Sequence, residues 1–350
     1  MDYALLKRLS ETAGISGREE HVRTLVAEHL ANRFKLRSTT DAMGNLIAHK
    51  AGNGPRVALV SHMDEVGFMV SKIENHGFVR VMPVGGVDPQ VFCAQKVIVH
   101  GNQDLMGVVG SVPPHLRNKD GKSAKKAMPI EEGFIDLGLP EEAVKKHVSV
   151  GDPVTFATRS WENQTSFFGK ALDDRLGLFV MLTVLEQISS VDCDLVLIAS
   201  TQEEYGLRGI GPALFKEKPQ IALILEGTVS SDTPGLKLPP NVCPTEQGKG
   251  PEIRLNDKRM IADRRLADFI TEQSRQNDLT HQLVVKNTGA TDAAAAQLIA
   301  EGIIVGAISV PTRYIHAPIS MARKDDITQS VKLVKAFLEN VSQFKLTTQE

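Results

Sequence analysis

Five separated segments of this chain carry histidine or acidic residues directly after an apolar run or at a turn. The residues are His62 with Asp64, Asp173 with Asp174, Glu203 with Glu204, Glu226, and His316. Imidazole and carboxylate ligands without a thiolate suit divalent ions such as zinc, cobalt or manganese. The residue types therefore predict a divalent-metal centre assembled from distant parts of the sequence.

Such a centre could hydrolyse an amide bond. Two ions a few ångströms apart need a carboxylate between them, and together they lower the pKa of a bound water and polarise a carbonyl. A further carboxylate, held off the metals, must take the proton from that water. Glu203 and Glu204 could divide the two tasks, because adjacent residues leaving a strand point in different directions.

Each segment also has an ordinary structural interpretation. A His-x-Asp pair is often a hydrogen-bonded surface pair, and a Glu-Glu pair is often a solvated loop end. Asp173 and Asp174 before Arg175 could cap a helix, and His316 could be a core histidine. Glu226 is harder to explain in this way, because a carboxylate within an apolar region needs a partner. The occurrence of all five segments in order favours a site.

The elements that must position these residues form an alternating pattern after residue 169. Apolar runs predict strands at 56–60, 194–200, 221–225 and 303–309, and helical periodicity predicts helices at 175–188, 208–215, 261–276, 292–300 and from 325 onward. This alternation predicts an α/β fold with a mostly parallel central sheet sandwiched by helices. Ligands bind beyond the carboxyl ends of strands in such sheets, which is where the five segments fall.

The first part of the chain predicts a helix. Ser16 and Glu19 have the spacing of a capping box, and apolar residues then recur on one helical face at Val22, Leu25 and Leu30.

Residues 68–165 differ in composition and local pattern from the rest of the chain. Glycine and proline are frequent there, and short β-type runs occur at 77–84, 96–99, 105–109 and 153–156, with one helical stretch at 140–146. This pattern predicts a small β-rich domain inserted into a larger one. The expected division is 1–67 plus 166–350 for the catalytic domain, and 68–165 for the insertion.

Composition excludes several other classes of protein. The 350 residues carry a formal net charge of -2, so there is no overall basic field that would recruit nucleic acid or an anionic membrane. No apolar run approaches the roughly 20 residues that span a bilayer, and the N-terminus lacks a signal-peptide pattern. Cys93, Cys193 and Cys243 are widely separated, which argues against disulfides and favours a cytoplasmic location.

Four longer motifs resemble the family of glutamyl aminopeptidases and tetrahedral aminopeptidases, including its FrvX-like members. They are Ser61-His62-Met63-Asp64-Glu65-Val66-Gly67-Phe68, Lys170-Ala171-Leu172-Asp173-Asp174-Arg175-Leu176-Gly177, Gln202-Glu203-Glu204-Tyr205-Gly206-Leu207-Arg208-Gly209 and Arg313-Tyr314-Ile315-His316. Together with weaker matches, they cover nearly the whole chain in order.

The resemblance implies a role for each residue in the removal of N-terminal residues from peptides. Asp173 would bridge two divalent ions, with a cis peptide bond to Asp174. The first ion would bind His62 and Glu226, and the second would bind Glu204 and His316. Asp64 would orient the ring of His62, and Glu203 would be the general base. Zinc is favoured, with cobalt or manganese as alternatives.

Position 226 departs from the family pattern. Many relatives carry Asp where this chain has Glu226, and the extra methylene could alter metal spacing, preference or affinity. The motifs also leave the substrate open, because a metal-dependent deacylase or amidase acting on non-peptide conjugates would need the same ions. A third alternative is a non-catalytic assembly protein stabilised by metal, which the presence of both Glu203 and Asp173 disfavours.

The resemblance also implies assembly. The inserted domain would be barrel-like and would form dimer contacts, and in tetrahedral relatives the dimers build hollow dodecamers. The chain is therefore expected to be a homo-oligomer, between a dimer and a dodecamer. A basic, glycine-containing stretch at 117–126 is either a solvated loop or the lining of an entry or cavity.

Overall fold

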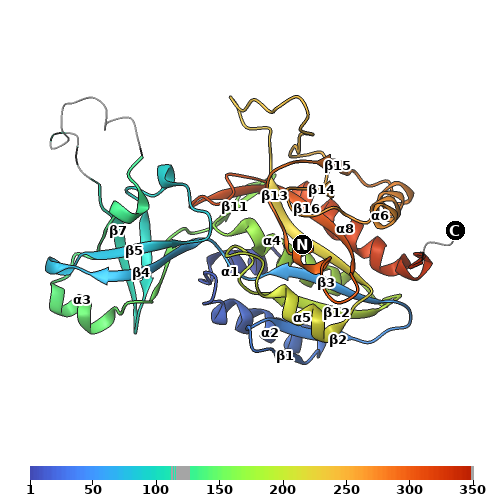
Figure 1. Cartoon of the computed structure of the whole chain (residues 1–350), viewed down its shortest axis with the longest axis horizontal. Helices are drawn as coiled ribbons and strands as arrows, with labels where there is room; N and C mark the ends of the chain where they lie inside the picture. Colours follow the sequence, from blue (N-terminus) through green and yellow to red (C-terminus); the bar gives the residue numbers. More distant parts are fainter. Residues whose placement is uncertain (112, 114, 116–126, 348–350) are drawn as a thin grey trace.

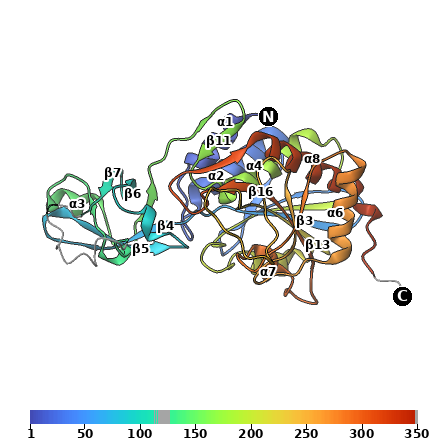
Figure 2. The same cartoon turned by 90° about the horizontal axis from the view of Figure 1, so that it is seen from above.

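The computed structural model describes residues 1–111, 113, 115 and 127–347. The basic stretch at 117–126 lies outside these residues. The described part of the chain forms an α/β unit and, beside it, a small barrel (Figures 1 and 2).

Four parallel strands form the middle of the large sheet. Their spatial order is β12 (Asp194–Ser200), β3 (Arg56–His62), β13 (Ile221–Val229) and β16 (Ile304–Arg313). They are the four strands predicted from continuous apolar runs. Both faces of these strands are buried, as expected for parallel strands covered by helices.

The edges of the sheet are antiparallel, which the sequence did not predict. One edge holds β2 (Leu46–Lys50) and β1 (Ser38–Thr40), and the other holds β17 (Ser320–Arg323), β11 (Ser166–Gly169) and β10 (Trp161–Glu162). β14 (Glu252–Asn256) pairs antiparallel with β16 and parallel with β15 (Gln282–Val285).

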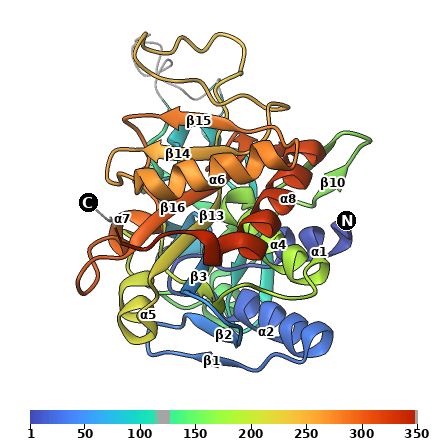
Figure 3. The same ribbon diagram turned by 90° about the vertical axis from the view of Figure 1, so that its right-hand side faces the viewer.

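Helices cover the two faces of the sheet, as predicted (Figure 3). One face packs against α1 (Tyr3–Glu11), α2 (Glu20–Phe34), α4 (Leu172–Gln187), α6 (Arg264–Gln276) and α8 (Lys324–Asn340), and the other against α5 (Ile210–Glu217) and α7 (Asp292–Ala296). Alternation along β3 supplies both cores: Val57 and Leu59 face the first, whereas Ala58 and Val60 face the second.

The barrel is built from short strands. Its closed order is β4 (Gly67–Ile73), β5 (Val79–Val84), β8 (Ile135–Asp136), β7 (Asp104–Val109), β6 (Lys96–His100) and β9 (Pro153–Phe156), with α3 (Glu141–His147) beside it. Phe68 lies at its centre, with ring centroids 4.9 Å from Phe92 and 5.4 Å from Phe156. The barrel therefore has a hydrophobic core of its own.

Short 3-10 helices join some of these elements. They are η1 (Asn75–Gly77), η2 (Pro89–Val91), η5 (Ile130–Glu132) and η6 (Val341–Gln343).

The predicted capping box is wrong. The helix begins at Glu20, and neither Ser16 nor Glu19 caps it through its side chain. The Ser16 hydroxyl donates instead to Asp64, and the Glu19 carboxylate accepts from the backbone nitrogen atoms of Gly17 and Gln202. Tertiary contacts to the strand ends therefore take both side chains.

Other predicted boundaries shift by a few residues. The helix expected at 292–300 ends at Ala296, and the helix expected at 261–276 begins at Arg264, after the N-cap Asp263. The strand expected at 221–225 continues to Val229. Glu226 therefore lies inside a strand rather than beyond its end.

An ion pair braces the segment that follows β13. Asp232 accepts from Arg313 Nε at 2.8 Å and Nη2 at 2.5 Å. Hydrogen bonding with Arg313 lowers the pKa of Asp232 to about 2. Because the folded pKa lies below the unfolded value of about 3.9, this stabilisation is present above pH 4 and is lost as the pH falls through 2.

We therefore expect Asp232→Asn to lower the melting temperature at neutral pH, with the difference from the wild type shrinking as the pH approaches 2. Thermal unfolding measured as a function of pH checks this. A difference that stays constant down to pH 2 would contradict the role assigned to the pair.

Candidate metal centre

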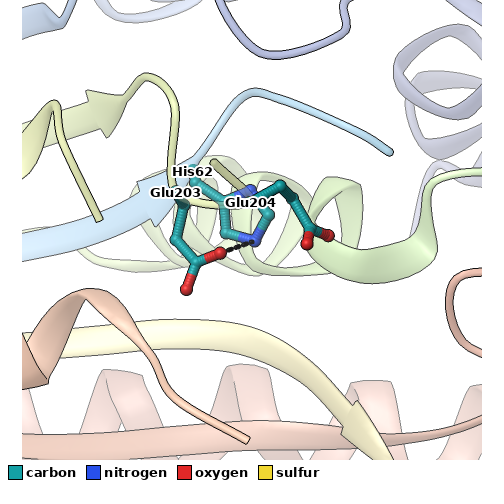
Figure 4. Close-up of side chains that lie close together, drawn as sticks. All are labelled: His62, Glu203 and Glu204. Carbon is teal, nitrogen blue, oxygen red and sulfur yellow. Dashed lines mark ion pairs between the residues drawn. The ribbon is translucent and has the colours of Figure 1, made fainter. Parts of the chain in front are cut away.

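The predicted site residues come from the carboxyl ends of the parallel strands and from one helix start. His62 is the last residue of β3, Glu203 and Glu204 follow β12, Asp173 lies in the first turn of α4, and His316 follows β16. Figure 4 shows the side chains of His62, Glu203 and Glu204 close together, with the ion pair between Glu203 and His62 marked. The peptide bond between Asp173 and Asp174 is cis, as the resemblance implied.

Asp173 lies between the two histidines. Its Oδ1 is 3.2 Å from His62 Nε2, and its Oδ2 is 3.5 Å from His316 Nε2. Each carboxylate oxygen therefore faces a different imidazole. Although burial raises the pKa of Asp173, hydrogen bonds with His316 and His62 bring it well below its usual range.

Both histidines use their other ring nitrogen for orientation. His316 Nδ1 lies 2.9 Å from the carbonyl oxygen of Gly86, which follows β5 of the barrel. His62 Nδ1 lies 3.1 Å from the carbonyl oxygen of Asp64. Because a carbonyl can only accept, each Nδ1 carries a proton, so a ring that binds a metal would do so through the lone pair of Nε2.

The positions of these Nε2 atoms fit a bound cation. His316 Nε2 lies 3.2 Å from Glu204 Oε1, yet that oxygen is buried and accepts no hydrogen bond. Burial alone would lower the pKa of His316, but Asp173 and Glu204 raise it to about 11. The two carboxylates thus favour positive charge between themselves and the ring, and a divalent ion there would satisfy all three groups.

Two groups of ligand atoms are compact enough for a metal among the residues that the structure describes. They are Asp173 with Glu204 and His316, and His62 with Glu203 and Glu204; within each group the atoms lie within 4.8 Å of one another. Nitrogen and oxygen donors of this kind suit zinc, cobalt or manganese. The residues therefore fit the divalent ions that the sequence implied.

Asp64 does more in the structure than the orientation of His62 that was predicted for it. Its Oδ1 lies 3.3 Å from His62 Nδ1. Its two oxygens accept from the backbone nitrogen atoms of Glu203 at 3.0 Å and Glu204 at 3.1 Å. One fully buried carboxylate thus fixes the histidine and both glutamates.

We expect Asp64→Asn to weaken metal binding by about 10–100-fold. The amide of asparagine would turn an NH₂ group toward one of the two backbone N–H donors, so that one orienting hydrogen bond is lost. Metal titration of the apo protein measures the effect. Asp136→Asn is the matched control, because Asp136 is exposed and accepts from the backbone nitrogen of Gly138 in the barrel. An unchanged affinity in Asp64→Asn would contradict this role.

Glu203 faces a cavity of about 420 Å³ that Asp173, Glu204 and His316 also line. Its carboxylate lies 4.0 Å from His62 Nε2. Burial raises the pKa of Glu203 well above its usual range, and the nearby charge of Glu204 adds to the effect. A carboxylate in this setting has a strong tendency to take up a proton.

Glu226 lines the same cavity but belongs to neither compact ligand group. Its Oε1 pairs with Arg254 Nη2 at 2.5 Å, and both side chains are buried. Its role as a ligand remains a prediction.

Two residues support the site through contacts that the sequence did not predict. Asp174 accepts from the backbone nitrogen atoms of His62, Gly177 and Gly227. Arg254 was missed although Glu252 and Arg254 flank an apolar residue on a short strand, a pattern that places both charges on one face. This alternation of charged and apolar residues is the sequence pattern that could have identified Arg254.

The fold and the site define a metal-dependent peptidase. The chain matches the family model described as M42 glutamyl aminopeptidase over residues 44–333, and it belongs to that family. Membership of this metallopeptidase family implies divalent metal ions. The chain is therefore an aminopeptidase, a hydrolase that acts on peptides, as the motifs had indicated.

Individual relatives align over nearly their full length. The putative aminopeptidase FrvX of Escherichia coli is 33% identical, with 99% of this chain and 97% of that protein aligned. An aminopeptidase structure from Desulfurococcus kamchatkensis has a TM-score of 0.90 at 33% identity, covering 98% of this chain and 97% of the other. The TET1 peptidase of Pyrococcus horikoshii, which can assemble into a tetrahedron or a large octahedral shell, has a TM-score of 0.86 at 28% identity, covering 96% and 98%.

Proposed function

We propose that this aminopeptidase uses two divalent ions and that Glu203 is its general base. The observation that carries the proposal is the position of Asp173, whose two oxygens face His62 at 3.2 Å and His316 at 3.5 Å. A carboxylate that presents one oxygen to each imidazole is suited to bridging two ions. His62 and Glu226 would complete the first site, and Glu204 and His316 the second.

When bound, the ions would supply Lewis acidity, lowering the pKa of a water and polarising the scissile carbonyl. Glu203 takes the proton as water attacks the carbonyl of the N-terminal residue, and it then returns the proton to the leaving amine. Its backbone is held by Asp64, which keeps the carboxylate facing the cavity.

Hydrolysis assays on the chelated enzyme resupplied with zinc, cobalt or manganese test this function. We expect turnover of peptides and aminoacyl-p-nitroanilides with a free amine, and little turnover of the same substrates after N-acylation. Preferential hydrolysis of N-acyl amino acids would favour the deacylase alternative. Two bound ions without turnover of any free-amine substrate would favour a non-catalytic assembly protein.

We also propose that the barrel is an inserted domain that forms dimer contacts. It corresponds to the predicted insertion at 68–165 in a catalytic domain of 1–67 and 166–350, except that β4 of the barrel begins at Gly67 and β10 (Trp161–Glu162) pairs in the large sheet. Large apolar side chains on β5 and β7 support this, since Met82, Met106 and Val108 are 49%, 56% and 45% exposed. The assembly of the TET1 relative supports larger oligomers. Light scattering after size fractionation would give the mass, and a purely monomeric species would contradict the proposal.

The cellular location is proposed to be the cytoplasm. The three cysteines are all unpaired thiols, as suits a reducing compartment. Among the described residues, none of the helices has the length and apolar character needed to cross a bilayer.

A further inference from the structure

Arg254 is a buried cation beside the candidate metal centre. It lies on β14, next to β16, and its side chain is only 3% exposed. It reaches three carboxylates: Nη2 pairs with Glu226 at 2.5 Å, Nε with Glu252 at 2.7 Å, and Nη1 with Asp257 at 3.3 Å. These contacts hold the guanidinium in one orientation.

Arg254 is fixed by further hydrogen bonds from its Nη2 to the hydroxyl groups of Thr228 at 3.0 Å and Ser309 at 3.3 Å. The ammonium of Lys286 shares one of the three carboxylates, lying 2.9 Å from Glu252. Burial of two cations with three carboxylates requires this close pairing, because an unpaired buried charge is strongly unfavourable. The guanidinium therefore cannot leave Glu226 without loss.

Glu226 and Glu204 differ in how available they are to a cation. The Oε1 atom of Glu204 is buried without a hydrogen bond, and the group that it faces at 3.2 Å is Nε2 of His316, itself a proposed ligand. The Oε1 atom of Glu226 is already held by Arg254, and the Ser309 hydroxyl donates to it at 3.3 Å. A divalent ion that used Glu226 would have to displace the guanidinium or lie close to it, and two like charges repel in a poorly solvated site.

We propose that Arg254 competes with the first metal ion for Glu226, so that the two metal sites load unequally. Asp173, Glu204 and His316 form the high-affinity site. The site at His62 and Glu226 fills only at higher metal concentration, because binding there breaks or strains the ion pair. This inference rests on the proposed dinuclear centre and specifies how this chain controls its occupancy.

Calorimetric titration of the apo protein with Zn²⁺, combined with elemental analysis of the bound metal, tests the inference without any measurement of activity. The wild type is expected to bind two ions in steps whose dissociation constants differ by at least about tenfold. Arg254→Met is expected to strengthen the weaker step by at least about tenfold, because it removes a buried positive charge that would lie beside the ion. The dissociation constant of the tighter step should not change.

Lys286→Met is the matched control, because it removes a cation from the same cluster while leaving the contact between Arg254 and Glu226 in place. It should leave the ratio of the two dissociation constants unchanged. Arg254→Lys keeps the charge of the cluster, but the single ammonium group of lysine cannot pair with three carboxylates at once. It provides an intermediate strengthening of the weaker step if Arg254→Met does not fold.

Four results would contradict these proposals. Two wild-type steps of equal affinity would overturn the inference, as would unchanged steps in both folded Arg254 variants. Equal strengthening by Lys286→Met would also overturn it, because the effect would then be one of net charge. A wild type that binds no metal would instead contradict the proposed function itself.

Discussion

Replacement of Glu203 by Gln is expected to lower kcat by about 10²–10⁴-fold, the usual contribution of a general base, while both metal sites remain loaded. Gln keeps the size of the side chain but cannot accept the proton from the attacking water. The backbone nitrogen of residue 203 would still donate to Asp64, so the loop should keep its position. Steady-state kinetics and elemental analysis of the same sample measure the two effects.

Two further variants serve as comparisons for Glu203→Gln. Glu204→Gln should lose metal together with activity, because Glu204 belongs to both compact ligand groups. Glu142→Gln, an exposed change on the barrel helix, should alter neither. Near-normal turnover by Glu203→Gln with full metal content would exclude Glu203 as the base.

The central strands and the predicted site residues could be predicted from the sequence because each has a strong local pattern. A parallel strand covered on both faces needs a continuous apolar run, and β12 matches the predicted 194–200 residue for residue. Polar residues that directly follow such runs stand out, as His62, Glu203 and Glu204 do. The structure brings these three residues together with Asp173 and His316.

The remaining parts have weak or non-local signals. Edge strands such as β1 and β10 are two or three residues long and mostly exposed, so they lack an apolar run. The hydrogen bond from Ser16 to Asp64 joins residues 48 positions apart, and nothing in the local spacing distinguishes it from a helix cap. The pairing of Arg254 with Glu226 likewise depends on the path of β14 beside β16.

A second buried charge cluster is also non-local and is expected to control stability. Lys170 Nζ lies 2.6 Å from both carboxylate oxygens of Glu65, and Arg175 Nη2 lies 3.6 Å from one of them. The exposed fractions are 3% for Glu65, 4% for Lys170 and 0% for Arg175. Glu65 also accepts from the backbone nitrogen of Gly14 at 3.0 Å, so it joins the end of β3, the start of α4 and the loop after α1.

Glu65→Gln is expected to lower the free energy of unfolding by about 3–5 kcal/mol, because it leaves two buried cations without a carboxylate. Urea unfolding measures the loss, and Glu141→Gln is the control. Glu141 forms a comparable pair with Lys145 at 2.5 Å, but this pair is on the surface, where solvent screens the charges, and its loss should not shift the unfolding midpoint.

The double variant Glu65→Gln with Lys170→Met separates charge burial from lost packing. Removal of the lysine takes away one uncompensated charge, so the double variant should be more stable than Glu65→Gln alone. Arg175 would remain tied to the backbone carbonyl groups of Leu9, Thr12 and Met63, which limits the damage that its own charge can cause. If the second substitution instead adds its own loss, the cluster stabilises the fold through shape and hydrogen bonding, and the electrostatic explanation fails.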